Sequence, residues 1–252
     1  MQITVLMENE SRAPLCSEHG LSLYLRCGGA AFLLDAGQSG DFAQNAQDLG
    51  CPLEEVRAAV LSHGHYDHAD GFPALMRVNP DVRIYARPTV MKPRYEPHIG
   101  RYIGLSGLMR GEYAGRFELS DELRSIAPGL WLVPDAVEHE QSLVAETEKG
   151  LVVMNSCCHA GADHIVADVL ERFPGQRVRA LVGGLHLMGP GGPSTLGVET
   201  DAVRQLARRL TAELGVEDIC TGHCTGELGY ALLKEAVPGK VRPIHGGDVL
   251  EF

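Results

Sequence analysis

Four candidate metal ligands occupy six consecutive positions after an apolar run, Ala58 to Leu61: His63, His65, Asp67 and His68. Imidazole nitrogens and carboxylate oxygens hold zinc, iron or manganese where one coordination position must stay open for water. Neighbours on one helix face are three or four residues apart, so this spacing favours a loop after a strand. We expect the first two histidines to bind one metal and the Asp–His pair a second. The alternatives are a surface cluster and a single structural metal.

Three later apolar strands also end at candidate ligands. They precede, in chain order, Cys157 and His159, then His186, then His223. Strand ends line the crevice where ligands bind in layered α/β folds, so we expect these side chains at one edge of the molecule. Cys157 is either a thiolate ligand or a small buried residue. His186 is either a ligand or a catalytic residue that faces the substrate.

Other polar residues leave two interpretations open. Asp35 ends an apolar strand, as a turn residue or as an acceptor that orients a metal-bound histidine. His19 is a candidate to hold the substrate. His139 stands between two glutamates, which favours a solvated charged turn over a ligand. His98 is a further loop candidate, whereas His164 and His245 are expected to be structural.

Apolar periodicity and turn signals predict an α/β chain forming a single domain over 1–252. Strands are expected at 2–7, 82–88, 130–136, 178–187, 216–226 and 241–252, with hairpins over 21–37 and 142–156. Helices are expected at 41–49, 68–80, 162–173, 199–214 and 226–237. Each half contains a hairpin, then a helix, then a strand ending near a histidine, so the chain looks loosely doubled.

Residues 88–125 lose this periodicity and are rich in Gly, Pro, Tyr and Arg. A loop of this length inside a compact domain is usually functional or disordered. We interpret it as an inserted lid, in which Arg94 would meet an anionic substrate and Tyr102 would stack on one. The alternative is a solvated surface insertion.

Composition excludes several functional classes. The net charge of −11 argues against nucleic acid as a partner, because phosphate binding needs clustered Lys and Arg. No apolar run suits a membrane span, and the acidic start is unlike a secretory signal. The seven scattered cysteines favour free thiols in the cytoplasm, and the Cys220/Cys224 pair lacks the second pair that a zinc clip needs. The expected partner is a small molecule, and a homodimer is compatible with the sequence.

The motif His63-x-His65-x-Asp67-His68, with Asp35 at the end of the preceding strand, resembles the metallo-β-lactamase-fold hydrolases. The chain is most similar to the subgroup named for 7,8-dihydropterin-6-methyl-4-(β-D-ribofuranosyl)-aminobenzene-5′-phosphate synthase. The stretches that carry this resemblance are EHGLS (18–22), LLDAGQSG (33–40), SHGHYDH (62–68), Cys-x-His (157–159), GGLHL (183–187) and GHCTGE (222–227).

The resemblance implies a four-layer αβ/βα sandwich with the metal site at one edge of its two sheets. It implies five metal ligands: His63, His65, Asp67, His68 and His223. Where the superfamily has a bridging Asp, this chain reads Asn155-Ser156-Cys157. His159 is therefore expected as the missing histidine ligand, and Cys157 as a further one.

The expected activity is metal-assisted hydrolysis or group transfer on a small anionic, pterin-like substrate. One or two zinc ions are expected, with iron or manganese as alternatives, and a metal-bound hydroxide would attack the substrate. Asp67 would double as ligand and proton acceptor, and His186 and His19 would steady the substrate. The alternative is a non-hydrolytic metal protein on the same fold, either a redox site or a small-molecule sensor.

Overall fold

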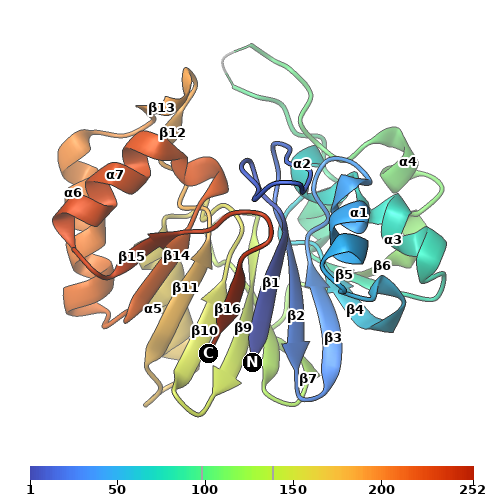
Figure 1. The fold of residues 1–252 in the computed structure, drawn as a ribbon, viewed down its shortest axis with the longest axis horizontal. Helices are drawn as coiled ribbons and strands as arrows, with labels where there is room; N and C mark the ends of the chain where they lie inside the picture. Colours follow the sequence, from blue (N-terminus) through green and yellow to red (C-terminus); the bar gives the residue numbers. More distant parts are fainter. Residues whose placement is uncertain (98, 138) are drawn as a thin grey trace.

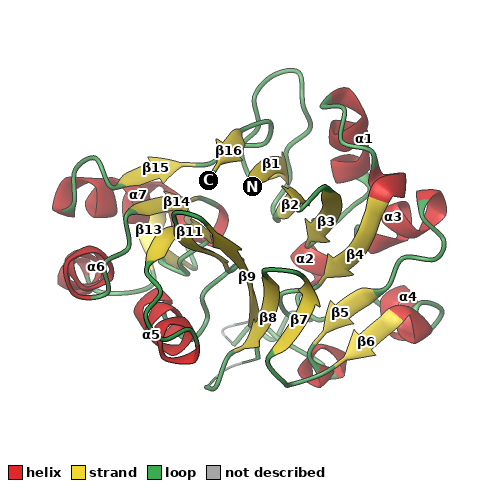
Figure 2. Cartoon of the chain, turned by 90° about the horizontal axis from the view of Figure 1, so that it is seen from below, coloured by secondary structure: helices red, strands yellow, loops and turns green. Residues whose placement is uncertain are grey.

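A computed structural model of the chain describes residues 1–97, 99–137 and 139–252. Two seven-stranded sheets face each other, and helices cover the outer face of each sheet (Figures 1 and 2). This arrangement confirms the predicted four-layer αβ/βα sandwich.

The first sheet has the order β16-β1-β2-β3-β4-β5-β6. Its strands are β16 (Val249–Glu251), β1 (Gln2–Met7), β2 (Ser22–Cys27), β3 (Ala30–Leu34), β4 (Val56–Val60), β5 (Ile84–Ala86) and β6 (Phe117–Leu119). The hairpin β2–β3 is antiparallel, and β3, β4, β5 and β6 run parallel. The parallel strands therefore end at the same edge of the sheet.

The second sheet repeats this plan in the order β15-β14-β11-β10-β9-β8-β7. Its strands are β15 (Val241–Pro243), β14 (Asp218–Thr221), β11 (Val178–Gly183), β10 (Gly150–Met154), β9 (Gln141–Thr147), β8 (Leu130–Pro134) and β7 (Arg124–Ala127). Again an antiparallel hairpin, β9–β10, is followed by parallel strands, here β11, β14 and β15. The predicted doubling is thus visible as two similar sheets.

The helices of the first half of the chain form one outer layer, and those of the second half form the other (Figure 2). The first layer contains α1 (Asp41–Asp48), α2 (Tyr66–Ala69), α3 (Phe72–Val78) and α4 (Gly107–Arg110). The second contains α5 (Ala162–Arg172), α6 (Thr200–Arg208), continued by a π-helical turn (Arg209–Glu213), and α7 (Gly226–Ala236). None of the helices in the described ranges is long and apolar enough to cross a membrane.

The core has three layers that follow the alternation of side chains along each strand. Ile3 and Val5 of β1 belong to the central cluster between the sheets, where Val152 of β10 also lies. Leu6 belongs to the cluster under the first helix layer, and Val153 to the one under the second. Apolar packing on both faces explains why strand interiors read as nearly continuous apolar runs.

Three stretches differ from the prediction. The helix expected over 68–80 is interrupted at Asp70 and Gly71 and forms the separate helices α2 and α3. A Cβ at Gly71 would lie 1.9 Å from the carbonyl oxygen of Ala36, so only glycine allows this close approach.

The aperiodic segment 88–125 contains short elements rather than one continuous loop. These are a 3₁₀ turn (Pro88–Met91), α4, a second 3₁₀ turn (Ala114–Arg116) and β6. Elements of three or four residues are too short to show periodicity, so the sequence pattern missed them. The part that projects beyond the sheets lies around residues 92–105, and a Tyr95–Tyr102 bridge joins its two limbs (Figure 1). The stretch 188–198, whose Gly/Pro-rich sequence favours a loop, contains the small hairpin β12 (Met188–Gly189) and β13 (Gly192–Leu196).

Candidate metal centre

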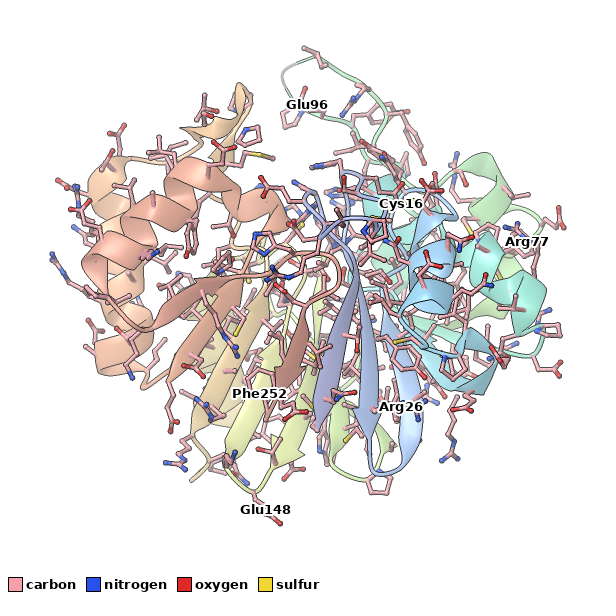
Figure 3. All side chains as sticks on the ribbon, viewed as in Figure 1. Cys16, Arg26, Arg77, Glu96, Glu148 and Phe252 are labelled. Atoms are coloured by element: carbon pink, nitrogen blue, oxygen red, sulfur yellow. The ribbon has the colours of Figure 1, made fainter. Side chains whose placement is uncertain are left out.

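The candidate ligands from both halves of the chain meet at the edge where β4, β10, β11 and β14 end. Glu96 of the projecting loop lies at this end of the molecule, and Glu148, in the β9–β10 turn, lies at the opposite end (Figure 3). Residues 62–68 follow β4, and residues 155–159 follow β10. The predicted edge site is therefore assembled from segments about a hundred residues apart.

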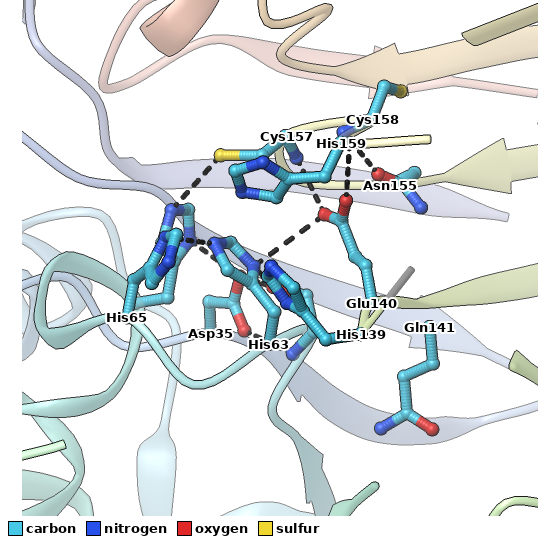
Figure 4. A network of polar contacts seen from close by, with 12 residues as sticks. Asp35, His63, His65, His139, Glu140, Gln141, Asn155, Cys157, Cys158 and His159 are labelled. Carbon is cyan, nitrogen blue, oxygen red and sulfur yellow. Dashed lines mark hydrogen bonds and ion pairs between the residues drawn. The ribbon is translucent and has the colours of Figure 1, made fainter. Parts of the chain in front are cut away.

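One cluster consists of histidines from both halves. The ligand nitrogens of His63, His65 and His159 lie within 4.8 Å of one another. His63 Nε2 is 2.9 Å from His65 Nδ1, and His159 Nε2 is buried without a hydrogen-bond partner among the described residues. Figure 4 shows these rings converging. A metal ion could bind these converging ring nitrogens, including the buried His159 Nε2 that lacks a partner among the described residues.

His139 belongs to the same neighbourhood, which corrects the expectation of a solvated turn. Its side chain is buried, and its ring centroid lies 4.8 Å from that of His159 (Figure 4). Its Nδ1 is also buried without a hydrogen-bond partner in the described part of the chain. The flanking glutamates suggested solvation, but Glu140 points inward and is fully buried. The neighbouring residue Glu138 lies outside the described residues.

A second cluster surrounds the carboxylate of Asp67. Its Oδ2 lies 3.3 Å from His19 Nε2, and 3.5 Å from both His68 Nε2 and His223 Nε2. Asp67, His68 and His223 are buried, and His19 is partly exposed. A carboxylate oxygen and three imidazole nitrogens are ligands that suit a divalent metal ion.

Cys157 lies between the two clusters. Its Sγ is 3.4 Å from His68 Nε2. The sulfur lies within 4.8 Å of the ligand nitrogens of His63 and His68, and also within 4.8 Å of the ligand atoms of His223 and Cys224. The structure therefore places the sulfur where it could contact ions on either side. Cys224 was not among the predicted site residues, since the Cys220/Cys224 pair drew attention only as a zinc clip.

Asp35 orients His68 from the side away from the cluster. Its Oδ2 accepts from His68 Nδ1 at 2.8 Å and from the Ser62 hydroxyl at 2.6 Å, and its Oδ1 accepts from the Ser62 backbone N–H at 2.7 Å. A carboxylate behind a histidine sets the tautomer that leaves Nε2 free. Of the two interpretations of Asp35, the structure supports the orienting acceptor.

Glu140 is a supporting residue that the sequence did not reveal. Its carboxylate accepts the backbone N–H of Cys157 at 2.8 Å and that of His159 at 2.9 Å, and lies 3.6 Å from His63 Nδ1 (Figure 4). Burial raises its pKa to about 8 despite these hydrogen bonds. Its charged sequence context resembles a surface turn, so no local signal identified it.

Electrostatics favour neutral imidazoles over most of the site. Burial lowers the pKa of His65 to about 3 and that of His223 to about 4, and it also holds the pKa values of His63 and His159 well below the usual range. A neutral imidazole is the metal-binding form.

His68 and Asp67 form the exception. Burial alone would lower the pKa of His68, but Asp67 and then Asp35 outweigh it and raise the value to about 9. Burial would raise the pKa of Asp67, but His68 and the hydrogen bond from His19 outweigh it, and the value lies well below the usual range. Without a metal, this pair is therefore an ion pair.

The buried thiols of Cys157 and Cys224 shift each other's pKa. Burial raises the pKa of Cys157, and the neighbouring Cys224 raises it further. For Cys224, hydrogen bonds from Cys157 and His186 outweigh burial, so the pKa of this thiol lies well below its ordinary value.

His186 lies beside the histidine cluster, with its ring centroid 4.3 Å from that of His159. The backbone φ is +52° at His186 and +49° at His223, a conformation that non-glycine residues rarely adopt. Asp35 and Cys158 share it, with φ values of +56° and +52°. Such strain at four strand ends around one site is typical of a functional centre.

The predicted substrate residues occupy different positions. His19 faces Asp67, and Arg94 is near enough to His65 and His139 to lower the pKa of both. The Tyr102 hydroxyl donates to the Leu105 carbonyl at 2.8 Å, and its ring packs against Tyr95 and Arg110, so Tyr102 braces the projecting loop.

His98 lies outside the described residues. His245 pairs with Asp248, and His164 lies on α5, so neither joins the clusters.

Comparisons with known proteins agree with this architecture. The family model of the metallo-beta-lactamase superfamily matches residues 18–223. A Methanocaldococcus jannaschii protein named 7,8-dihydropterin-6-methyl-4-(beta-D-ribofuranosyl)-aminobenzene-5'-phosphate synthase is 25% identical, over 95% of this chain and 92% of its own. The crystal structure of Tm1679, described as a metal-dependent hydrolase of the beta-lactamase superfamily, matches with a TM-score of 0.84 and 29% identity, over 100% of this chain and 99% of that one.

A diphosphatase from the PhnP family matches with a TM-score of 0.61 and 17% identity, over 100% of this chain and 96% of that one. At this identity the match shows a common fold alone. The family model covers most of the chain and includes every candidate ligand from His63 to His223. The chain therefore belongs to the metallo-β-lactamase superfamily.

Proposed function

We propose that this chain is a metal-dependent hydrolase that acts on a small anionic substrate. The observation that carries the proposal is the pair of donor clusters on either side of Cys157. One is all-imidazole, and the other contains the ionised Asp67. Two adjacent sites of different charge suit a reaction in which one position holds water and the other takes up developing charge.

The donor sets fit divalent ions. His63, His65 and His159 would hold one ion; Asp67, His68 and His223 would hold the other, with Cys157 between them. The Nε2 of His159 supports this assignment, because it is buried without a partner among the residues that the structure describes, and a buried nitrogen normally has one. We propose zinc, since imidazole, carboxylate and thiolate together suit it better than manganese or magnesium. When bound, such ions lower the pKa of water toward about 7 and polarise a carbonyl or phosphoryl oxygen.

The protein's own groups would position the reactants. Asp67 would pass the proton of the attacking water on to the partly exposed His19, whose Nε2 lies 3.3 Å from Asp67 Oδ2, because a carboxyl group with a pKa well below the usual range is too weak a base to keep it. Arg94 brings a positive charge close to His65 and would attract a phosphate or carboxylate. His186, beside His159, would contact the substrate from the opposite side.

The substrate class rests on two observations. Arg94 supplies a cation close to His65 and His139, and the M. jannaschii relative is named for a reaction that involves a pterin and a phosphate ester. We therefore propose a phosphate- or carboxylate-bearing substrate with a flat ring. All seven cysteines are free, which supports a reducing cytoplasmic location.

His65→Ala tests the mechanism. It removes one of three nitrogens from the first cluster, and it should abolish both metal uptake at that position and hydrolysis of phosphodiester, lactone and thioester probes. Metal content and hydrolysis rate are measured on the same preparation. His164→Ala, on α5 and outside both clusters, is the matched control and should keep both. Full activity in the His65 variant would contradict the proposal.

The sulfur at the centre of the site favours one alternative, a non-hydrolytic redox or sensor protein. Cys157 is a soft ligand that iron also accepts. Iron in the purified protein, with an absorption spectrum that changes in air, would support this alternative. Hydrolysis of a probe that follows zinc or manganese loading would support the hydrolase.

A further inference from the structure

Cys224 is a buried thiol at the metal centre to which the proposed function gives no role. It directly follows His223 at the end of β14. Cys157 Sγ, Cys224 Sγ and a ring nitrogen of His223 lie within 4.8 Å of one another, and all three residues are buried. Two sulfurs therefore lie close to an imidazole of the second cluster.

The contacts of Cys224 are weak and long. Its Sγ accepts the backbone N–H of His186 at 3.3 Å, and its S–H points to the Cys157 carbonyl oxygen at 3.6 Å. A backbone N–H aimed at sulfur stabilises a thiolate, as do the outer hydrogen bonds to metal-bound thiolates. The S–H contact to a carbonyl is weak, so it can be exchanged for a bond to a metal.

The chain also leaves room for this sulfur. A Cβ at Gly184 would lie 2.4 Å from Cys224 Sγ, so the glycine allows the thiol to turn inward. Cys220, four residues earlier and within β14 itself, is also buried, but its sulfur accepts from Arg242 and lies outside the cluster. The two thiols of β14 and its end therefore have different surroundings.

We propose that Cys224 supplies a second thiolate to the metal centre beside Cys157, making the position at His223 a soft site that takes Zn²⁺ or Cd²⁺ in preference to Mn²⁺ or Mg²⁺. On binding, the Cys224 sulfur forms a bond to the metal as a thiolate, and a proton that it shares with Cys157 leaves to solvent, with no change of oxidation state. The inference rests on the proposed function, because it assumes that the centre binds metal. It adds a ligand that the family resemblance does not imply.

Cobalt substitution measures the number of thiolates directly. Holoprotein loaded with Co²⁺ under reducing conditions shows a near-ultraviolet band for each thiolate bound to the metal. Cys224→Ser should remove roughly half of the wild-type intensity, Cys157→Ser the other half, and the double variant all of it. Cys220→Ser is the matched control and should keep the full intensity. Full intensity in Cys224→Ser, with none in Cys157→Ser, would overturn the inference.

X-ray absorption at the zinc edge tests the inference without any variant. Wild-type zinc holoprotein should show two sulfur neighbours per protein molecule at about 2.3 Å. A single sulfur per molecule, in a protein that binds zinc and hydrolyses a probe, would refute the role of Cys224 and leave the hydrolase standing. Failure to bind any divalent ion would refute both proposals.

Discussion

Asp35→Asn changes one atom behind the metal centre and should weaken metal binding sharply. The asparagine keeps the shape of the side chain and tolerates the φ of +56°. Its oxygen can still accept from the Ser62 backbone N–H. Its amide NH₂, however, replaces the oxygen that accepts from His68 Nδ1 at 2.8 Å. Two donors then face each other, unless His68 moves its proton to Nε2.

That proton would occupy the nitrogen facing Asp67 and Cys157, where a metal ion must bind. The cost is about one hydrogen bond to a charged group, roughly 1.5–3 kcal/mol. At about 1.4 kcal/mol per factor of ten, metal affinity at the second cluster should fall about 10- to 150-fold. This range includes the effect usually seen when a residue behind a metal ligand is lost.

Competition with a chelator measures the affinity of each of the two positions. Asp70→Asn is the matched control. Asp70 lies two residues after His68, but its carboxylate accepts from the Ser106 backbone N–H at 3.1 Å and not from a histidine. It should change affinity less than about twofold. A folded Asp35→Asn protein with wild-type affinity at both positions would refute the orienting role of Asp35.

Three further predictions concern the metal-free protein, the projecting loop and the α2–α3 break. In metal-free protein, the free energy of unfolding should fall as pH rises from about 7 to about 9, because folded Glu140 and His68, with pKa values raised to about 8 and about 9, keep protons that the unfolded chain has released. Below about pH 6.5 the buried histidines with lowered pKa values act in the opposite sense, because only the unfolded chain binds their protons. Urea titrations at several pH values measure this, and a rise between about pH 7 and 9 would contradict it. Arg94→Gln should raise KM for an anionic substrate about tenfold and leave a neutral substrate unaffected, as steady-state kinetics can show. Gly71→Ala should lower the free energy of unfolding by about 3 kcal/mol, because its Cβ meets a backbone oxygen at 1.9 Å. Gly107→Ala, with open space around it, should change that energy by no more than about 1 kcal/mol in thermal denaturation.

Much of the fold and the site could be predicted because the signals were local. The apolar run before His63 and the ligands after it lie within eleven residues, and the same pattern recurs before His159 and His223. A strand that ends in a ligand predicts both the strand and the edge of the sheet where the ligand lies. Ligands that follow parallel strands were therefore expected to meet at one edge, even from different halves of the chain. The doubling of the sheets was visible for the same reason.

The remaining features depend on contacts that no local pattern contains. Glu140 supports Cys157 and His159 across 17 and 19 residues of chain, although its own neighbours read as a solvated turn. Cys224 reaches Cys157 across 67 residues. The short elements after Pro88 place Val90, Met109 and Phe117 in the core cluster under the first helix layer, which no periodicity indicates. Tertiary contacts therefore override local sequence character at these positions.

The last strand has a consequence for how the protein is made. β16 leaves the second half of the chain and pairs with β1, with Leu250 opposite Ile3. Until residues 249–251 have been synthesised, β1 exposes one unpaired edge of an apolar sheet. Exposed edges of this kind can pair with other chains and aggregate. A nascent chain that has not yet added β16 to the first sheet would therefore be vulnerable to aggregation through β1.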